Sequence, residues 1–400
     1  MKSKLILILA LAVLAFPTLA QATQFAIVGP RAMGMGGASV AAVNDATAVY
    51  WNPAALADYK KVEIRIPAGA AIRDHIGLQD KWDRINAIYQ TSSPSLALLT
   101  ELDQLLTDLD KPKSGTDIDA HVGLLVSIPA GRSAFAISAL GLTYAGIYPT
   151  IDTLNRDTTP TPTPITSNNS AVTGAGLVSR EPGVAFATPL GEKFFIGANA
   201  KMMSVTTYVH SESIRTGDFD TFIDDLDLSE TSSSEASIDA GILFKASENL
   251  RIGVVGRYLN SPSFPFQGVV ASRDGFGDVS TSMMTVPYYI EIEPQFRAGV
   301  AWKPVSAVTL SADYDLSKNK SLGIPGYEDQ TMAVGAEIRL PKEIVSIRAG
   351  AYKNTAADDA NLVYTAGLGL RIYFFRMDVA GAYDFDDKEG QVSANLAFRF

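Results

Sequence analysis

The amino-acid sequence predicts an all-β protein, namely a 14-stranded antiparallel transmembrane β-barrel with an N-terminal plug inside the lumen and a small helical insert in the first long loop. Three observations support this fold class. From Lys61 onward, segments alternate between apolar and polar side chains with a period of two, as strands with one apolar face do. Their connections are alternately short and long, and the number of strands is even. Together these features are typical of a barrel that spans a membrane.

The first 22 residues have the parts of a secretory signal peptide. Lys2 and Lys4 form the charged start, Leu5–Phe16 is an apolar run, and Ala20-Gln21-Ala22 is an A-x-A cleavage site. After this segment no run of 18 apolar residues occurs, so the sequence predicts no transmembrane helix. The chain contains no cysteine, and therefore has neither a lipid-anchor site nor disulfides. These features predict an exported protein of the bacterial envelope.

Composition narrows the class of protein. The net charge of −10 argues against a nucleic-acid partner, because phosphate contacts need clustered Lys and Arg. Hydrophobic residues make up 47% and charged residues 19%, which suits either a soluble β-sandwich or a membrane barrel. The connections favour the barrel, since Ile128–Arg132 and Thr188–Glu192 are short turns, whereas Asp74–Thr116 and Gly146–Thr173 are long polar loops.

Residues 23–60 differ from the rest of the chain and predict an irregular plug. Its glycines allow tight turns and close packing, and Asn44 or Asp45 is expected to cap a short helix over Ala46–Tyr50 that ends before Pro53. A phosphate-binding loop is not predicted, because no strand precedes the glycines and their spacing is not GxGxxG. The residues of this plug motif are Gly34, Gly36, Gly37, Asn44, Asp45, Asn52 and Pro53.

Residues 61–400 predict the barrel, with apolar side chains toward lipid and polar side chains toward the lumen. In the first strand, for example, Val62, Ile64 and Ile66 oppose Glu63 and Arg65. The charged residues that we expect inside the lumen include Arg65, Arg297, Asp313, Arg339, Arg348 and Asp378. Either they pair with polar plug residues such as Arg31, Asn44, Asp45 and Asn52, or they fill and hydrate the lumen.

Aromatic residues mark the strand ends. The tyrosines expected in an interfacial girdle are Tyr144, Tyr148, Tyr258, Tyr314, Tyr352, Tyr364 and Tyr383. Phe400 ends the chain on the apolar face, two residues after Phe398. This ending resembles the signal that the bacterial barrel assembly machinery reads in outer-membrane barrels.

The first long loop, residues 75–116, has leucines at helical spacing. Within residues 78–110, leucines that include Leu96, Leu99, Leu102 and Leu106 predict one or two amphipathic helices on the long-loop side. Such an insert forms either a lid or apolar groove at the barrel mouth, or a folded cap with its own core.

No catalytic or metal-binding motif stands out. The chain has no HExxH, Walker loop or Ser/His/Asp signature, and His75, His121 and His210 are far apart in sequence. The acidic segment from Asp218 to Glu230 lacks the spacing of an EF-hand and is best explained as a solvated charge run, with loose divalent-cation binding near lipopolysaccharide as the alternative. We therefore expect no enzyme activity, no cofactor and no metal.

The plug motif carries a family resemblance. Gly34–Gly37, Asn44-Asp45 and above all Asn52-Pro53-Ala54-Ala55-Leu56 resemble the plug of FadL/TodX-type outer-membrane transporters for fatty acids and hydrocarbons. The recurrent strand–proline–turn pattern and Phe400 extend this resemblance over the mature chain. The chain is more similar still to the FadL-like branch known as conjugal transfer protein TraF, whose members share the opening GPRAMGMGGA…YWNPAAL and a helical insert after the first strand.

The resemblance implies a location in the bacterial cell outer membrane, with lipid, lipopolysaccharide and the barrel assembly machinery as partners. It implies passive uptake of small hydrophobic compounds of the fatty-acid or hydrocarbon class, which leave the lumen by plug movement or a lateral opening. The candidate ligand contacts in the plug, which equally suit packing of the plug in place, are Phe25, Met33, Met35, Tyr50 and Trp51. The alternative is a non-transporting envelope protein, such as a TraF-like conjugal transfer accessory or a secretion scaffold.

Overall fold

The fold was analysed in a computed structural model. It describes residues 19–20, 24–74, 77–111, 114–159, 164–320, 327–340, 344–357, 360–386 and 389–400. Apart from 19–20, the expected signal peptide (residues 1–22) lies outside the described residues, as does His75. Within the described part of the chain, no helix is both long and apolar enough to cross a bilayer.

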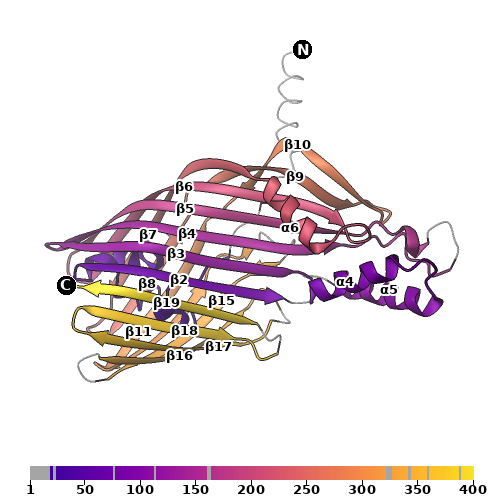
Figure 1. The fold of residues 1–400 in the computed structure, drawn as a ribbon. Coiled ribbons are helices and arrows are strands. Elements are labelled where there is room, and N and C mark those ends of the chain that lie inside the picture. The colour runs from indigo at the N-terminus through magenta and orange to yellow at the C-terminus, as the bar shows by residue number, and fades with distance from the viewer. Residues whose placement is uncertain are drawn as a thin grey trace, which may run out of the picture.

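The main body is a closed barrel of 14 strands in which all neighbours are antiparallel, as predicted (Figure 1). The last strand pairs with the first, so that Phe398 lies opposite Ile64 and no edge stays open. In barrel order the strands are β2 (Glu63–Asp74), β3 (Thr116–Ala130), β4 (Ser133–Thr150), β5 (Ala171–Leu190), β6 (Phe194–Ser213), β7 (Thr231–Lys245), β8 (Leu250–Arg257), β11 (Gln295–Val305), β12 (Val308–Asp315), β15 (Thr331–Arg339), β16 (Val345–Asn354), β17 (Val363–Ile372), β18 (Phe375–Tyr383) and β19 (Gly390–Arg399).

Alternation of side chains gives the barrel an apolar exterior and a polar interior. On β2, Ile64 and Ile66 are 36% and 42% exposed, whereas Glu63 and Arg65, which alternate with them, are buried in the lumen. Because successive residues of a strand point to opposite faces, each strand adds one apolar column to the outside. We call the end with the short turns the turn end and the other the loop end.

The prediction of a tyrosine girdle is confirmed for only some of the tyrosines. Tyr314, Tyr364 and Tyr383 are exposed on the outer surface, but Tyr144 and Tyr258 are buried inside the barrel. Tyr144 lies at an inward position of β4. Tyr258 follows β8 with a φ of 53°, and its N–H donates to Asp239 Oδ1 at 3.0 Å. Tyr352 also belongs to the interior, where it lines a cavity described below.

A second, small sheet lies inside the barrel wall, and most of it falls within residues 260–285, which the alternation pattern assigns to a long loop. It consists of the hairpin β9 (Ser263–Arg273) and β10 (Val279–Glu291), with β1 (Leu19–Ala20) parallel to β10. β9 covers the inner face of β6, because the Thr207 hydroxyl donates to the carbonyl of Pro265 and the Ala271 N–H donates to Ser211 Oγ. A shorter hairpin, β13 (Asn319–Lys320) and β14 (Glu328–Asp329), follows β12.

The helical insert forms a cap with its own core. It contains α4 (Leu78–Tyr89) and α5 (Leu96–Leu109), which extend beyond the strands at the loop end, and α6 (Phe219–Leu228) packs beside them (Figure 1). Trp82 contacts Phe222 edge to face, with ring centroids 5.4 Å apart. This core extends to the short helix η2 (Ile165–Ser167) through Ile165. Of the two alternatives for this insert, the structure therefore shows the folded cap.

The plug is built from three short helical segments inside the barrel. They are α2 (Pro30–Met33), α3 (Ala48–Trp51) and the 3₁₀ helix η1 (Pro53–Ala57). The helix expected over 46–50 begins two residues later, because Asp45 Oδ1 accepts from the N–H and the hydroxyl of Thr47 and holds the preceding turn. Pro53 ends α3 as expected and at the same time begins η1, where a missing N–H costs nothing.

The C-terminal aromatics gather on the outer surface at the turn end. Phe374 stacks on both Phe398 and Phe400, with ring centroids 6.4 and 5.9 Å apart. Phe400 is exposed, and its N–H donates to the carbonyl of Val62. A role of these rings in barrel assembly stays a prediction.

Candidate functional site: the plug and the vestibule above it

The plug rests on an arc of glycines in the barrel wall. On Gly335 and Gly350 a Cβ atom would lie less than 3 Å from backbone atoms of Met35 or Gly36, so only glycine allows the plug backbone to approach this closely. Gly335 and Gly350 are direct cross-strand partners. The wall glycines whose missing Cβ faces the plug, which we call the glycine arc, are Gly197, Gly241, Gly253, Gly299, Gly335, Gly350 and Gly367.

Inward polar side chains hold the plug backbone. Asp313 Oδ2, on β12, accepts from the N–H groups of Ser39 and Val40 at 2.7 and 2.8 Å. Thr365 Oγ1 accepts from the N–H of Gly36, and His121 Nε2 accepts from the N–H of Gly29. These contacts satisfy backbone donors that have no water around them, since an unpaired buried donor is costly.

A chain of buried ion pairs joins the plug to the wall. Arg31 donates from Nε and Nη2 to the two carboxylate oxygens of Glu337, at 3.1 and 2.9 Å. Glu337 also accepts from Arg348 Nε at 2.9 Å, and Arg348 Nη2 donates to Asp378 at 2.8 Å. All four side chains are almost fully buried. We call Arg31, Glu337, Arg348 and Asp378 the ion-pair chain.

A second buried group begins at Arg65. Its guanidinium lies 2.7 Å from Glu63 and 3.5 Å from Asp45 of the plug, and 3.7 Å from Asp378. Arg339 is less buried and lies 3.8 Å from Glu337. Of the two alternatives for the expected lumen charges, the structure thus places Arg65 and Arg348, like Asp313, in direct or shared contact with the plug.

The plug aromatics form a packed trio. Phe25 stacks on Trp51, and Tyr50 meets both rings edge to face. The Tyr50 hydroxyl donates to the carbonyl of Ala26, and Trp51 Nε1 donates to that of Val28. Arg257 lies 3.8 Å from the Tyr50 ring and Arg297 lies 4.0 Å from the Phe25 ring, which is cation–π geometry.

The remaining plug residues serve the same packing. Met33 and Met35 are buried, and Met35 abuts the glycine arc. Gly36 and Gly37 have positive φ angles of 66° and 87°, and Gly34 packs on Gly367. The Asn52 side chain donates to the carbonyls of Val40 and Ile242 and accepts from the N–H of Ala54, whereas Asn44 is only half-buried.

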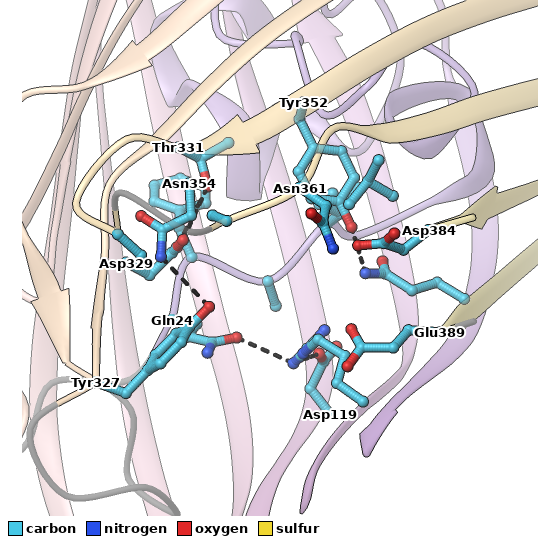
Figure 2. A pocket seen from close by; sticks show the side chains of 18 of the residues that line it. Gln24, Asp119, Tyr327, Asp329, Thr331, Tyr352, Asn354, Asn361, Asp384 and Glu389 are labelled. Atoms are coloured by element: carbon cyan, nitrogen blue, oxygen red, sulfur yellow. Dashed lines mark hydrogen bonds and ion pairs between the residues drawn. The ribbon is translucent and has the colours of Figure 1, made fainter. Parts of the chain in front are cut away.

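A vestibule of about 480 Å³ opens above the plug at the loop end (Figure 2). Plug residues 24–27 form part of its lining. Asn354 Nδ2 donates to the Tyr327 hydroxyl, and Gln391 Nε2 donates to the Tyr352 hydroxyl. The labelled side chains of Figure 2 come mostly from the ends of wall strands and from loops that are distant in sequence.

Carboxylates exceed free cations in this vestibule. Arg73 is tied to Asp117 and Asp119 at 2.5 and 2.6 Å and donates to Gln24 of the plug at 3.0 Å, and Arg297 is paired with Asp315. The acidic residues of the lining are Asp119, Asp329, Asp384, Asp386 and Glu389, against the basic residues Arg73, Lys111 and Arg297. The acidic lining therefore repels anions but not neutral or cationic compounds.

Asp329, in the β13–β14 hairpin, makes the fold sensitive to pH. Burial, and secondly the charge of Asp315, raises the pKa of Asp329 from 3.8 to about 7. The folded protein then holds a proton that the unfolded chain releases, so stability falls as the pH rises from about 4 to 7. We expect Asp329→Asn to flatten this dependence of the unfolding midpoint temperature. Asp386→Asn, at an exposed position of the same vestibule, is the control. An unchanged pH profile in Asp329→Asn would contradict the assignment.

A second hollow, of about 520 Å³, lies in the wall where β3, β4 and β5 meet. Its lining is mostly apolar and includes Gly123, Gly141 and Pro182. Gly141 pairs with the exposed Val122 and Gly123 pairs with the buried Leu140, so one glycine leaves the outer face and the other the inner face of the wall without a side chain, and the wall is thin here. Glu181 and His121, whose side chains are buried inside the barrel, also border this hollow.

Sequence reasoning missed most of the vestibule. Arg73, Asp329 and Asn354 lie at strand ends or in short hairpins, and only the closed barrel brings them together. On β16 the inward positions carry even residue numbers, and Tyr352 is one of them. The alternation therefore identifies Tyr352 as a lumen residue rather than a girdle residue.

Comparison with known structures agrees with this geometry. The chain is similar to the CymD monoaromatic hydrocarbon channel, with 14% identity, a TM-score of 0.56 and coverage of 94% of this chain and 98% of that chain. It is also similar to the Ralstonia pickettii toluene transporter TbuX (14%, 0.53, 93% and 97%) and to a Pseudomonas aeruginosa FadL homologue (12%, 0.51, 96% and 99%). The chain thus has the fold of FadL-type barrels. No curated protein matches its sequence.

A match to a sequence family places the chain in a narrower group than its fold does. Residues 49–315, more than half of the chain, match the family model described as F plasmid transfer operon, TraF, protein. The match begins inside α3 of the plug and reaches the end of β12. The chain therefore belongs to this TraF family and has a FadL-type barrel fold.

Proposed function

We propose that the chain is a channel of the bacterial outer membrane that admits small hydrophobic compounds by passive diffusion. The apolar outer belt suits a bilayer, with lipid and lipopolysaccharide around it. Compounds would enter the vestibule from the loop end, outside the cell. They would leave past the plug or through the thin wall between β3, β4 and β5.

The observation that carries this proposal is the lining of the vestibule. Phe25, Ala26 and Ile27 of the plug are among the residues that line the cavity, together with Tyr327 and Tyr352. A compound of the size of one aromatic ring fits a volume of about 480 Å³. Contact between such an apolar compound and these side chains carries little cost in free energy. The fold is shared with channels whose names specify monoaromatic hydrocarbons.

The charge of the vestibule selects between the two ligand classes that the sequence leaves open. A fatty-acid anion would meet the acidic side chains of Asp384, Asp386 and Glu389, while Arg73 and Arg297 are already paired with carboxylates. Like charges in a confined polar cavity repel, and so raise the barrier to uptake. We therefore favour neutral hydrocarbons over fatty acids.

The test is an uptake measurement in Gram-negative cells that lack FadL-type channels of their own. Cells that produce the chain are expected to accumulate labelled toluene several times faster than cells without it, and to show a smaller gain for octanoate. Ala360→Trp, which fills the vestibule, should remove most of the gain. Ala97→Trp, on the exposed side of α5 outside the vestibule, is the matched control.

The amount of folded barrel in the outer membrane is measured for each variant, so that lost uptake is separated from lost protein. Equal toluene uptake with and without the chain would overturn the proposal. A larger gain for octanoate than for toluene would overturn only the choice of ligand class.

The dense plug favours a second candidate, a non-transporting envelope protein that serves conjugation or secretion as a scaffold. Phe25, Tyr50 and Trp51 are each at most 4% exposed, and the ion-pair chain holds the plug in the wall. Such a protein would leave toluene uptake unchanged. It would bind other envelope proteins through its exposed loops and cap.

A further inference from the structure

The outer face of β6 carries a cluster of metal-ligand side chains near the loop end. His210 and Glu212 are two residues apart on the strand and therefore point to the same side. α6 packs across this face, with Phe222 5.9 Å from the His210 ring, and Asp225 follows Phe222 by one helical turn. Strand and helix thus bring His210, Glu212 and Asp225 together, and we call them the β6–α6 cluster.

The cluster is close but not internally bonded. Potential ligand atoms of its three residues lie within 4.8 Å of one another. His210 Nε2 and Asp225 Oδ2 are 3.8 Å apart, which is too long for a hydrogen bond. Glu212 Oε2 is buried, and no donor among the described residues reaches it. Two carboxylates beside an imidazole, one of them with an unsatisfied oxygen, form a set of donors that favours a cation between them.

The surroundings hold these side chains in place. A Cβ on Gly217 would collide with the Glu212 carboxyl group, so this glycine provides the space in which the carboxylate lies. The loop at Gly217 is fixed by Asn86 of α4, whose Nδ2 donates to its carbonyl at 2.6 Å. Asp218 caps α6 by accepting from the N–H of Thr221 at 2.9 Å, which sets the direction of the helix.

We propose that His210, Glu212 and Asp225 bind one divalent transition-metal ion, and that Zn²⁺ is the ion that they suit best. One imidazole nitrogen and two carboxylate oxygens are ligands that Zn²⁺ accepts at about 2.0–2.2 Å, which places neighbouring ligand atoms about 3.3 Å apart. Binding would draw the ligand atoms, which now lie within 4.8 Å of one another, closer together. Ca²⁺ and Mg²⁺ prefer oxygen ligands throughout, and so suit the site less well.

The bound ion would fasten the cap to the barrel. Asp225 belongs to α6, and His210 and Glu212 belong to the wall, so a shared ion adds a cross-link between the two. A groove of about 330 Å³ borders His210 and Asp225 and reaches β9. Three protein ligands leave one position on a tetrahedral ion for water or for a donor that lies in this groove.

The proposal is tested by titrating the detergent-purified full chain with Zn²⁺ in a calorimeter. One Zn²⁺ per chain is expected. Asp225→Asn and Glu212→Gln should each weaken binding at least tenfold, because each removes one charged ligand but keeps the shape of the side chain. Asp224→Asn removes the same charge from the exposed side of α6 and should leave binding unchanged.

A second readout does not depend on the variants. The chain has only three histidines, and His121 is buried against the plug. Zn²⁺ is therefore expected to protect His210 from acylation by diethyl pyrocarbonate, as measured by peptide mass spectrometry, while Ca²⁺ at the same concentration gives no protection. The absence of Zn²⁺ binding in the wild-type chain would overturn the proposal. So would an equal loss in Asp224→Asn, or equal protection by Ca²⁺, since either identifies a diffuse acidic surface.

Discussion

Gly335→Ala is expected to lower the free energy of unfolding by about 1–3 kcal/mol and to loosen the plug, because the new methyl group overlaps its backbone. The Cβ would lie less than 3 Å from three atoms of Met35, two of which belong to the backbone and cannot rotate away. The plug must shift as a unit, and its hydrogen bonds to Asp313 would lengthen with it. Stability is measured by urea unfolding of the detergent-purified barrel, and loosening by the reaction of a single cysteine introduced at Met35 of the otherwise cysteine-free chain.

The control for this prediction is Gly381→Ala on β18. A Cβ there meets only the carbonyl of Gln391, at the ordinary distance of 3.5 Å. Both substitutions place the same residue in a wall strand, so intrinsic strand preference is held constant. If the two variants lose equal stability, the glycine arc is not the seat of the plug.

Glu337→Gln is expected to cost about 3–5 kcal/mol, the loss typical of removing one partner from a buried ion pair. Glu337 is the only carboxylate hydrogen-bonded to Arg31 within the described residues, and it also accepts from Arg348. The neutral amide would leave two buried guanidinium groups facing each other with less compensation. The change is measured as a fall in the unfolding midpoint in urea.

Glu101→Gln, which removes a carboxylate from an exposed pair with Arg84 in the cap, is the comparison and should leave the midpoint unchanged. Replacing Arg31 and Glu337 together by methionine separates charge from packing. If this double variant is as stable as the wild type, the pair serves to position the plug rather than to stabilise it. If Glu337→Gln leaves the unfolding midpoint unchanged, the ion-pair chain does not hold the plug.

The barrel was predictable from sequence because its physics is local. Alternation along β2, β11 or β19 sets which side faces lipid, and the lengths of the connections distinguish the two ends. The girdle was only partly predictable, since Tyr144 and Tyr314 both lie in alternating strands, and the parity of each strand decides which faces lipid. The hairpin of β9 and β10 was missed because it pairs with itself inside a segment that the pattern assigns to a long loop.

The candidate site was harder to predict from the sequence than the barrel. The sequence motif marks the plug, but the partner of Arg31 lies 306 residues later, and no local pattern connects the two. The acidic segment of residues 218–230, explained above as a charge run, also contains the pattern of the helix α6. Phe219, Phe222, Ile223 and Leu226 have helical spacing behind Asp218, which is a good N-cap. In a helix, this pattern places Asp225 one turn after Phe222.

The glycine arc also bears on the order in which the molecule is assembled. The plug is synthesised before any wall strand, yet its seat extends from β6 to β17, and the last glycine of that seat, Gly367, lies more than 300 residues after the plug. Such distant contacts form late, because long loops must close first. The plug thus has no complete binding surface until nearly the whole wall exists. We infer that its docking follows closure of the barrel and makes a seated plug a marker of correctly completed folding.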